Sequence, residues 1–411
     1  MSLGRPLRFC MITTFYPPYN FGGDGIFVHR LANELAQRGH QVDVIHSIEA
    51  FNLGNGNAGV QGYDNHPNVT VHGLSSPLGF ISPLATQQTG VPVFHAAAIQ
   101  QILQKGFDVI HYHNVSLVGG PRVLRYGQGI KLYTTHEYWL VCPTHILFRY
   151  NRAPCVQPHC LLCSLIYRRP PQLWRYTGYL NSALKHVDRI IAPTRFAKEV
   201  QIRRGLRGPI IDLPNFAPTI ELADLESPAD PVLAQPYFLF VGRLEKIKGL
   251  QTLIPAFQNY NANLLIAGTG SYEPELRRLA AGNPRIHYLG RIDQAQLQWL
   301  YRRAIAVIVP SISYETFSLV MLEAYRQQTP TIVRNLGGLP EICEQSGGGI
   351  SYNTQDDLVA AMDRLASEPA TRREMGLRGY RAFQKKWTAE AHLERYLALV
   401  HEIADARGLT L

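Results

Sequence analysis

Two basic residues stand close together in a turn bounded by glycines, in the second half of the chain. Residues 241–249 read VGRLEKIKG and directly follow a predicted strand. Glycines allow a close approach to the backbone, and the guanidinium of Arg243 and the ammonium of Lys248 can neutralise two negative charges. The pattern suits the binding of a diphosphate, although by itself it is equally typical of two surface bases beside a turn.

A second stretch, residues 310–324, carries two carboxylates eight residues apart, Glu315 and Glu323. A helix that begins near Ser318 places Glu315 in the preceding loop and Glu323 about one and a half turns inside the helix. The backbone N–H groups of the first turn then form an anion site. Two carboxylates here suit the recognition of hydroxyl groups, one on a sugar and one on a ribose. Taken singly, Glu315 is also typical of the acids favoured near a helix N-terminus.

Apolar runs that alternate with amphipathic stretches must position these residues. The predicted strands are 8–14, 41–46, 108–113, 131–135 and 189–192 in the first half, and 237–241, 263–267, 285–288, 306–309 and 331–334 in the second. Thr194 is expected to cap a helix, and residues 381–405 form a long amphipathic stretch. This alternation predicts an α/β fold with two doubly wound parallel sheets facing across a cleft, where ligands bind at the carboxyl ends of the strands.

Length and composition predict two folded domains. The chain has 411 residues, of which 46% are apolar and 17% are charged, which exceeds one ordinary core and argues against disorder. We predict a first domain at 1–205 and a second at 206–387, with a helix at about 388–411 that packs back on the first. Residues 214–236 are a predicted linker. Since no run of 18 apolar residues occurs, a cytoplasmic protein is expected.

The net charge of +9 is concentrated in the first half of the chain. Residues 1–200 hold 17 Lys and Arg against 9 Asp and Glu, giving +8, and residues 201–411 hold 23 against 22, giving +1. This asymmetry favours an anionic partner for the first half: a phosphorylated substrate, an anionic membrane surface or nucleic acid. An incidental bias on a solvated face is the alternative.

These stretches together identify a family that the chain resembles, the retaining family 4 glycosyltransferases with the GT-B architecture. The resemblance rests on VGRLEKIKG and the E-x7-E pair, in the order and at roughly the separation found in the family. Further matches are TTFYPPYNFGGDGIFVHRLANELAQRGHQVDV, DVIHYHN, THEYWL, APTRFAKEV, LPNF, LLIAGTGSYEPEL and GGLPEI. The resemblance covers nearly the whole chain, and the combination is specific.

The resemblance implies a role for each matching residue of the second half. Arg243 and Lys248 match the basic pair that holds the donor diphosphate. Glu315 matches the acid near the hydroxyls of the donor sugar, and Glu323 the acid that binds the ribose. The turn whose backbone amides meet sugar and phosphate corresponds to Phe317, Ser318 and Leu319.

In the first half the resemblance implies that Gly22 and Gly23 belong to a glycine loop that closes over the phosphates. His136 matches the histidine that faces the transferred sugar. One departure concerns Thr316, which stands where many members have a glycine, so the loop conformation and the sugar specificity are not fixed by the resemblance.

The activity implied is the transfer of a sugar, with retention, from a UDP- or GDP-sugar to a hydroxyl of a saccharide or of a lipid-linked acceptor. No D-x-D triplet occurs, so no catalytic metal is expected. A nucleotide-sugar epimerase of the same architecture is the alternative enzyme. A zinc-dependent nucleic-acid binder is a third reading, which the diphosphate motifs disfavour, and we expect no nucleic-acid partner.

Four cysteines crowd into one short stretch that follows THEYWL. Cys142, Cys155, Cys160 and Cys163 have the spacing C-x12-C-x4-C-x2-C, which suits a structural zinc site, an iron–sulfur cluster or simply free thiols. We predict a zinc-pinned loop that shapes the acceptor pocket.

The next segment, residues 167–176, mixes basic and aromatic residues. It can rest on an anionic membrane surface, or it can be an ordinary helix entry in which Trp174 is packed. His111 and His113 share one face of a predicted strand, and we assign them structural roles.

Overall fold

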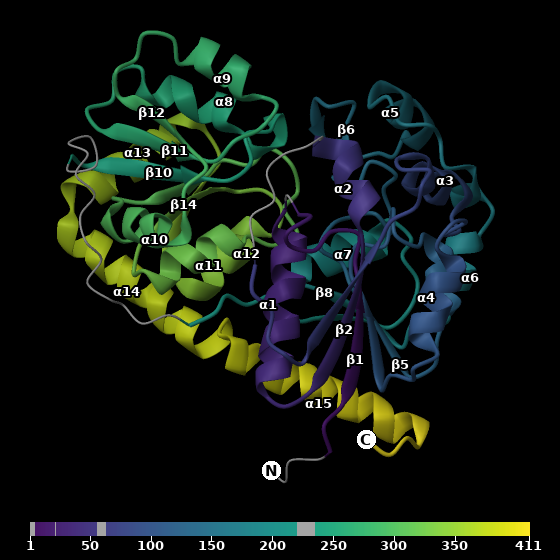
Figure 1. The fold of residues 1–411 in the computed structure, drawn as a ribbon. Coiled ribbons are helices and arrows are strands. Elements are labelled where there is room, and N and C mark those ends of the chain that lie inside the picture. Colours follow the sequence, from purple (N-terminus) through teal and green to yellow (C-terminus); the bar gives the residue numbers. More distant parts are fainter. Residues whose placement is uncertain (1–4, 21, 56–62, 220–234) are drawn as a thin grey trace. The chain divides into compact units, whose positions relative to one another are not determined.

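A computed structural model of the chain describes residues 5–20, 22–55, 63–219 and 235–411 (Figure 1). The chain forms two compact units. The first comprises Met1–Asn151, Val156–Asn215 and His392–Leu411, and the second comprises Arg152–Cys155 and Phe216–Ala391. The predicted linker, residues 214–236, lies largely outside the described residues, since 220–234 are not described.

The first unit is built on a sheet of seven parallel strands in the order β3-β2-β1-β4-β5-β8-β9. These strands are β1 (Arg8–Ile12), β2 (Gln41–Ser47), β3 (Val69–Leu74), β4 (Val109–Tyr112), β5 (Ile130–Thr134), β8 (Arg189–Ala192) and β9 (Ile210–Asp212). Strands β1, β4 and β5 are almost wholly buried, as expected for a parallel sheet covered on both faces.

Helices connect these strands. They are α1 (Gly23–Gln37), α2 (Ile48–Asn55), α3 (Ile81–Thr89), α4 (Ala96–Leu103), α5 (Cys160–Ile166), α6 (Tyr179–Leu184), α7 (Arg195–Arg203) and, at the end of the chain, α15 (Ala389–Arg407). Two 3-10 helices, η1 (Pro121–Arg125) and η2 (Leu173–Tyr176), and the two-residue strand β6 (Phe148–Arg149) complete the series. The strand β7 (Ala153–Pro154), which pairs with β6, is assigned to the second unit. As predicted, Thr194 caps α7, because its hydroxyl accepts from the N–H of Ala197 at 3.0 Å.

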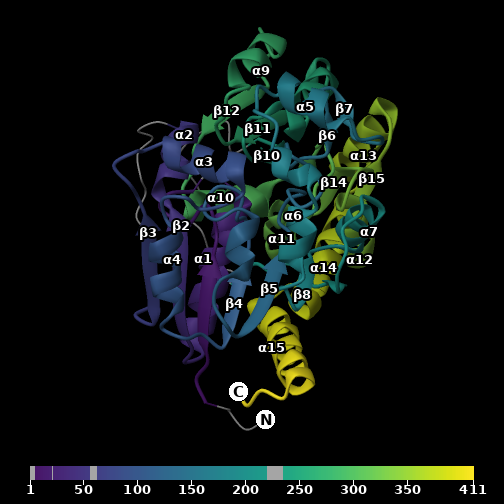
Figure 2. The ribbon, with the colours of Figure 1, turned by 90° about the vertical axis from the view of Figure 1, so that its right-hand side faces the viewer.

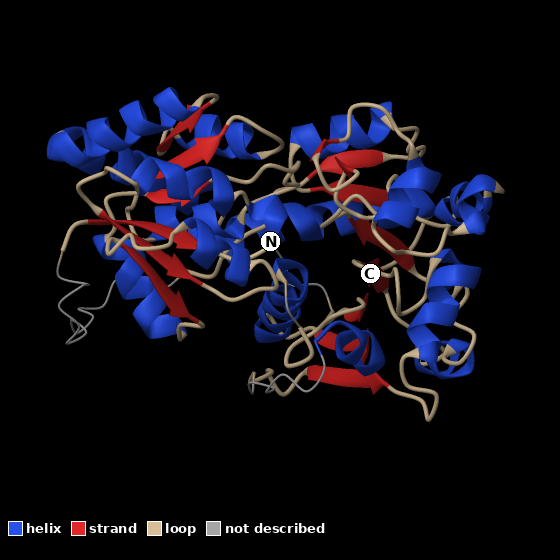
Figure 3. Cartoon of the chain, turned by 90° about the horizontal axis from the view of Figure 1, so that it is seen from above, coloured by secondary structure: helices blue, strands red, loops and turns tan. Residues whose placement is uncertain are grey.

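The second unit contains a sheet of six parallel strands in the order β12-β11-β10-β13-β14-β15. The strands are β10 (Tyr237–Val241), β11 (Asn263–Ala267), β12 (Ile286–Gly290), β13 (Val307–Val309), β14 (Thr331–Arg334) and β15 (Gly349–Tyr352). Figure 3 shows helices on both faces of the sheet in each unit. The predicted fold class, two doubly wound parallel α/β sheets, is therefore confirmed.

The helices of the second unit follow the same alternation. They are η4 (Lys246–Lys248), α8 (Leu250–Leu253), η5 (Ile254–Phe257), α9 (Glu273–Leu279), α10 (Gln294–Arg303), α11 (Leu319–Arg326), α12 (Leu339–Ser346), α13 (Gln355–Ser367) and α14 (Pro369–Lys386). The long amphipathic stretch predicted at 381–405 is not one helix, because α14 ends at Lys386 and α15 begins at Ala389.

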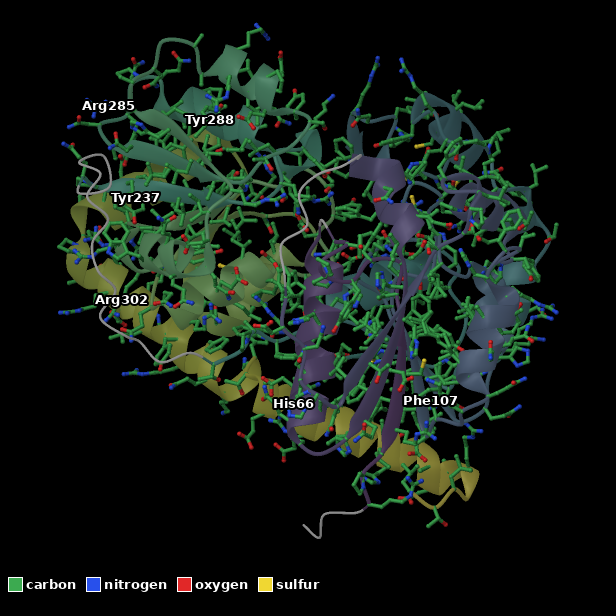
Figure 4. The ribbon with its side chains drawn as sticks, in the orientation of Figure 1. His66, Phe107, Tyr237, Arg285, Tyr288 and Arg302 are labelled. Carbon is green, nitrogen blue, oxygen red and sulfur yellow. The ribbon has the colours of Figure 1, made fainter. Side chains whose placement is uncertain are left out.

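Each sheet has a position at which the strand order reverses. In the first sheet β1 lies between β2 and β4, and in the second β10 lies between β11 and β13. Ligands of doubly wound folds bind at the carboxyl ends of the strands beside such a switch point. Phe107 and Tyr237, labelled in Figure 4, stand at the opposite, amino ends of β4 and β10. No helix among the described residues is long and apolar enough to cross a membrane.

Candidate active site

The loop after β10 carries the predicted basic pair and packs against the loop after β13. Gly249 has φ +79°, and a Cβ atom there would lie 1.9 Å from the carbonyl oxygen of Pro310. The N–H of Ile312 donates to the carbonyl of Ile247 at 2.9 Å. Only glycine allows this conformation and this approach, so VGRLEKIKG ends in a glycine because two loops of the site meet there.

The loop after β14 supports the same region from the other side. A Cβ atom at Gly337 would lie 2.7 Å from the backbone nitrogen of Glu315, and the N–H of Gly338 donates to the carbonyl of Glu315 at 2.8 Å. The backbone of Glu315 is therefore fixed by packing and a hydrogen bond. It stands at the switch point of the second sheet.

Glu315 and Lys248 form an ion pair at this point. The ammonium of Lys248 donates to Oε1 of Glu315 at 2.6 Å, and the hydroxyl of Ser311 donates to the same oxygen at 2.7 Å. Burial raises the pKa of Glu315, but Lys248, Ser311 and Arg243 outweigh it and lower the pKa below its ordinary value of 4.5. Because both donors bind Oε1, Oε2 is the oxygen that can accept a hydrogen bond from a ligand hydroxyl.

Arg243 lies at the mouth of the same loop and is more exposed. Its guanidinium donates to Oε1 of Glu245 at 2.7 Å, and 43% of the side chain is exposed. Exposed pairs of this kind contribute little to stability. The pair leaves the planar donor group of Arg243 accessible to a ligand, and phosphate is a group that a guanidinium binds well.

The helix of the E-x7-E stretch begins where the sequence predicts. Ser318 is the N-cap residue of α11 and makes no side-chain cap hydrogen bond, so the N–H groups of the first turn are not satisfied by the cap. Phe317 is 9% exposed and belongs to the core of the second unit. This buried ring anchors the turn, and Leu319 is the first residue of the helix.

Glu323 lies inside α11, and its Oε2 accepts a hydrogen bond from the hydroxyl of Tyr301 at 3.0 Å. Tyr301 is the antepenultimate residue of α10 and is 1% exposed. The tyrosine therefore holds the carboxylate from within the core. Sequence analysis missed Tyr301 and Ser311, because each reaches its glutamate through tertiary structure or a short loop that no sequence spacing identifies.

In the first unit the predicted glycines stand at the start of α1. Gly22 is the N-cap residue and Gly23 begins the helix. The side chain of Asn20 brackets this entry, since its Nδ2 donates to the carbonyl of Gly22 at 2.9 Å. In the first turn, Oδ2 of Asp24 accepts from Nδ2 of Asn114 at 3.3 Å. This bond joins the start of α1 to the segment that follows β4, at the switch point of the first sheet.

His136 follows β5 and is bonded to a second histidine. Its Nε2 lies 3.0 Å from Nδ1 of His113, and the two rings are stacked with their centroids 5.2 Å apart. Burial lowers the pKa of His136 to about 4, although Asp24 raises it, and burial also lowers the pKa of His113. Both rings are therefore neutral at pH 7, so one nitrogen of the pair carries the proton and donates.

The second nitrogen of His113 indicates which ring donates. Nε2 of His113 is buried and has no hydrogen-bond partner among the described residues. A buried N–H without an acceptor is costly, so the proton belongs on Nδ1 of His113, which donates to Nε2 of His136. His136 then carries its own proton on Nδ1, as a donor. Sequence analysis gave His113 a structural role; the geometry makes it the residue that orients His136.

His111 is fully satisfied by its surroundings. Its Nε2 lies 2.8 Å from the hydroxyl of Thr134, and its Nδ1 lies 3.0 Å from the hydroxyl of Tyr396 in α15. Burial lowers the pKa of His111 far below its ordinary value. The residue thus joins the last helix to the sheet, which agrees with the structural role predicted for it.

The four cysteines do not form the predicted metal site. The described residues contain no group of three or more His, Cys, Asp or Glu side chains that could hold a metal ion. Cys155 belongs to the second unit, whereas Cys142, Cys160 and Cys163 belong to the first. Sequence spacing suggested a common ligand set, but the fold does not gather the four thiols as ligands.

Other contacts hold this segment in place. Nδ1 of His145 lies 2.8 Å from Oε2 of Glu137. The guanidinium of Arg175 lies over the rings of Trp174 and Trp139, at 4.6 and 5.3 Å from their centroids. Such cation–π contacts are stronger when they are desolvated, and burial lowers the pKa of Arg175 to about 10. A hydrogen bond between His145 and Glu137 and a cation over two indoles hold the segment in which the prediction placed zinc.

Comparisons with known proteins agree with this geometry. Residues 21–219 match the family described as Glycosyltransferase Family 4, and residues 227–382 match Glycosyl transferases group 1. An uncharacterized glycosyltransferase of Methanocaldococcus jannaschii is 26% identical over 400 residues, covering 88% of this chain and 90% of that protein. A D-inositol 3-phosphate glycosyltransferase of Thermobifida fusca is 25% identical over 419 residues, covering 93% and 89%.

Solved structures share the fold over its full length. Sucrose-phosphate synthase from Thermosynechococcus elongatus superposes with a TM-score of 0.73 at 23% identity, covering 97% of this chain and 100% of that one. Anabaena HepE in complex with UDP superposes with a TM-score of 0.61 at 16% identity, covering 98% and 100%. With the two family matches spanning most of the sequence, the chain belongs to glycosyltransferase family 4, has the GT-B fold and uses a nucleotide-sugar donor.

Proposed function

We propose that this protein transfers a hexose, with retention of the anomeric configuration, from a UDP- or GDP-sugar to a hydroxyl of a saccharide or a lipid-linked acceptor. The observation that carries the proposal is the pair of Lys248 with Glu315, 2.6 Å apart, at the switch point of the second sheet. A fixed cation, a fixed carboxylate and the start of α11 meet there, which suits a ligand with both phosphates and hydroxyls.

Arg243 and Lys248 bind the diphosphate of the donor. During transfer the bond between the anomeric carbon and the β-phosphate oxygen breaks, and its electron pair leaves with the phosphate. The two cations and the N–H groups of α11 stabilise this growing negative charge. The acceptor oxygen bonds to the anomeric carbon on the face that the phosphate leaves, and its proton passes to a phosphate oxygen. No protein carboxylate has to act as a nucleophile.

The hydroxyl groups of the donor are recognised by two anionic acceptors and one neutral donor. Oε2 of Glu315 takes a hydroxyl of the sugar, and Glu323, held by Tyr301, takes the ribose. His136 presents its Nδ1–H to the transferred sugar, and Gly22 and Gly23 approach the phosphates through their backbone. These roles agree with the family resemblance, and the contacts of Glu315 and His136 support them.

The donor is identified with a panel of UDP-, GDP- and ADP-sugars, scored by the melting temperature of the full chain. A donor that binds the folded state raises the melting temperature by mass action. We expect the nucleoside diphosphate with the correct base to give most of the rise in melting temperature that the complete nucleotide-sugar gives, since the cations bind the diphosphate. A chain that shows no shift with any nucleoside diphosphate contradicts the proposal.

The role of Lys248 is tested by Lys248→Ala, measured as kcat with the donor found above. We expect a fall of about 10²–10³-fold, the scale on which removal of one preorganised charge-stabilising donor acts. Lys246→Ala is the matched control, because Lys246 lies in the same turn, and it is expected to stay near wild type. Near wild-type turnover of Lys248→Ala removes the proposed role.

The same assay separates transfer from epimerisation. A transferase releases the nucleoside diphosphate in step with added acceptor. An epimerase interconverts nucleotide-sugars without one. Product analysis of the sugar linkage then determines whether the anomeric configuration is retained.

A further inference from the structure

Helix α5 turns its apolar side chains outward. Leu161, Leu162, Leu165 and Ile166 are 53%, 52%, 55% and 46% exposed, whereas Cys163 and Ser164 are buried. Residues three and four apart share one face of a helix, so Leu161 with Leu165, and Leu162 with Leu165 and Ile166, form a continuous stripe. A surface helix usually buries such a stripe, and here the buried side is formed by a thiol and a hydroxyl instead.

Exposed apolar side chains also lie on η2, whose Tyr176 interacts electrostatically with Cys160, the first residue of α5. Leu173 is 70% exposed and Tyr176 is 63% exposed, while Trp174 between them is buried. The indole Nε1 of Trp174 donates to the carbonyl of Gln87 in α3 at 2.9 Å, which fixes η2 against the body of the unit. We call Leu161, Leu162, Leu165, Ile166, Leu173 and Tyr176 the outer patch. Helices α3, α5 and α6 lie along one side of the first unit (Figures 1 and 2).

The segment that carries the outer patch has charges of one sign only. Residues 138–187 contain Arg149, Arg152, Arg168, Arg169, Arg175 and Lys185 and no Asp or Glu. Arg168 is exposed, and its N–H donates to the carbonyl of Leu165 at 2.9 Å, so the turn after α5 places this cation at the edge of the patch. A second copy of the chain would bring the same cations to the interface, and like charges repel.

We propose that the outer patch docks the first unit onto an anionic lipid bilayer. Exposed apolar patches rimmed by polar groups mark interaction sites, and leucine side chains beside arginines are the composition of interfacial helices that bind anionic lipid. The patch inserts its leucines between headgroups, and Arg168 contacts the phosphates. Docking on a bilayer favours a lipid-linked acceptor over a saccharide, and this conclusion about the acceptor rests on the proposed function. The docking itself does not depend on the proposed function.

The test is co-sedimentation of the full chain with vesicles of phosphatidylglycerol and phosphatidylcholine, compared with phosphatidylcholine alone. We expect binding to the anionic vesicles that weakens with salt. The variant Leu161→Glu/Leu165→Glu is expected to bind at least tenfold more weakly, and Arg168→Glu about fivefold more weakly. Ile202→Glu is the matched control, because Ile202 is 46% exposed and lies on a different helix, α7, and it is expected to bind like wild type.

Three results overturn the proposal. They are equal sedimentation with and without anionic lipid, unchanged binding of the double leucine variant, and a change in the oligomeric state of that variant, which would make the patch an interface between copies. The melting temperature of each variant and its shift with donor show that the fold and the donor site are intact. Loss of vesicle binding with an intact donor shift is thus distinct from failure of the proposed glycosyl transfer.

Discussion

The two units hold their ionisable site residues in opposite ways. In the second unit cations and carboxylates are paired, Lys248 with Glu315 and Arg243 with Glu245, and the low pKa of Glu315 keeps that pair charged. In the first unit His113 and His136 are bonded to each other, and burial lowers the pKa of both. Charged groups suit an anionic diphosphate, and neutral donors suit an uncharged sugar. The second unit is therefore suited to recognise the charge of the donor, and the first unit to recognise its hydroxyl groups.

The same contrast extends through the whole of each unit. Of the 15 histidines of the chain, only His287 belongs to the second unit, so the first holds the other 14. The second unit instead relies on close backbone approaches at its site, such as Gly249 against Pro310. The second unit should therefore lose donor binding when a side chain is added at such a glycine, and the first unit should lose stability in acid.

The largest effect is expected from a single methyl group at the donor site. Gly249→Ala places a Cβ 1.9 Å from the carbonyl oxygen of Pro310, at φ +79°. The positive φ costs about 1–2 kcal/mol, and the clash forces the loops that carry Lys248 and Glu315 apart. We expect donor affinity, measured by calorimetric titration with the nucleoside diphosphate, to fall at least 100-fold.

Gly282→Ala distinguishes the cost of a positive φ from the cost of a steric clash. Gly282 belongs to the second unit and has φ +78°, but nothing lies within 4 Å of a Cβ atom there. It carries the same backbone cost without the clash, so it should lower the melting temperature and leave donor affinity near wild type. If both variants weaken binding equally, close packing of the loops is not what positions the site.

Acidification should destabilise the first unit before the second. Burial lowers the pKa of His136 and of His392 to about 4 from an ordinary 6.5. The unfolded chain therefore binds more protons between pH 6.5 and 4, and stability is complete above pH 6.5 and falls as the pH is lowered. Each pH unit costs roughly 1.4 kcal/mol per histidine. The lowered pKa of Glu315 costs the second unit stability only below about 4.5.

Hydrogen exchange of the full chain, followed by mass spectrometry, measures this difference. Peptides from β4 and β5 should lose protection between pH 6.5 and 4.5, after correction for the intrinsic exchange rate, and peptides from β10 and β13 should keep it. Simultaneous loss in both sheets would mean that the two units unfold as one and that the histidines do not set the acid limit.

The central strands and the donor loops could be predicted from the sequence, because their signals are local. Every interior strand of both sheets overlaps a predicted strand, and β8, β10, β11 and β14 have the predicted bounds. The strands that were missed, β3, β9 and β15, are all at sheet edges. The burial of β3 is partial, so its residues need not be continuously apolar, and a pattern of apolar residues does not reveal it.

Residues that act through tertiary contacts could not be predicted. The cysteine spacing was interpreted as zinc binding, but Glu137, His145, Arg175 and two indoles hold that segment, and they come from both sides of a long loop. The bond from His113 to His136 joins neighbouring strands across 23 residues. Spacing along the chain gives residue types and order; it does not show which side chains meet.

A smaller effect is expected when the charge of Glu315 is removed at constant shape. Glu315→Gln loses the ion pair with Lys248, and a hydrogen bond to a charged group contributes about 1.5–3 kcal/mol. We expect kcat/KM for the donor to fall about 10–100-fold. The stability lost relative to wild type should be present above about pH 4.5 and shrink progressively as the pH falls below it, as the wild-type carboxylate takes up its proton. Ser311→Ala, which removes only the neutral donor, is the milder comparison.

The smallest effect, and the sharpest test of the neutral pair, is expected from His113→Phe. The ring volume is nearly kept, but the N–H that His113 donates to Nε2 of His136 is lost. The neutral form of His136 then loses one stabilising hydrogen bond, so its pKa rises, although burial still holds that pKa below the ordinary value. We expect kcat to fall about tenfold, since an oriented hydrogen bond is worth about 1.4 kcal/mol, with KM little changed. The acid limb of the kcat–pH profile should move to higher pH.

His111→Phe is the control. It removes a buried histidine with no hydrogen bond to His136, so it should lower the melting temperature and leave the acid limb in place. An acid limb that does not move in His113→Phe would leave His113 with a structural role alone.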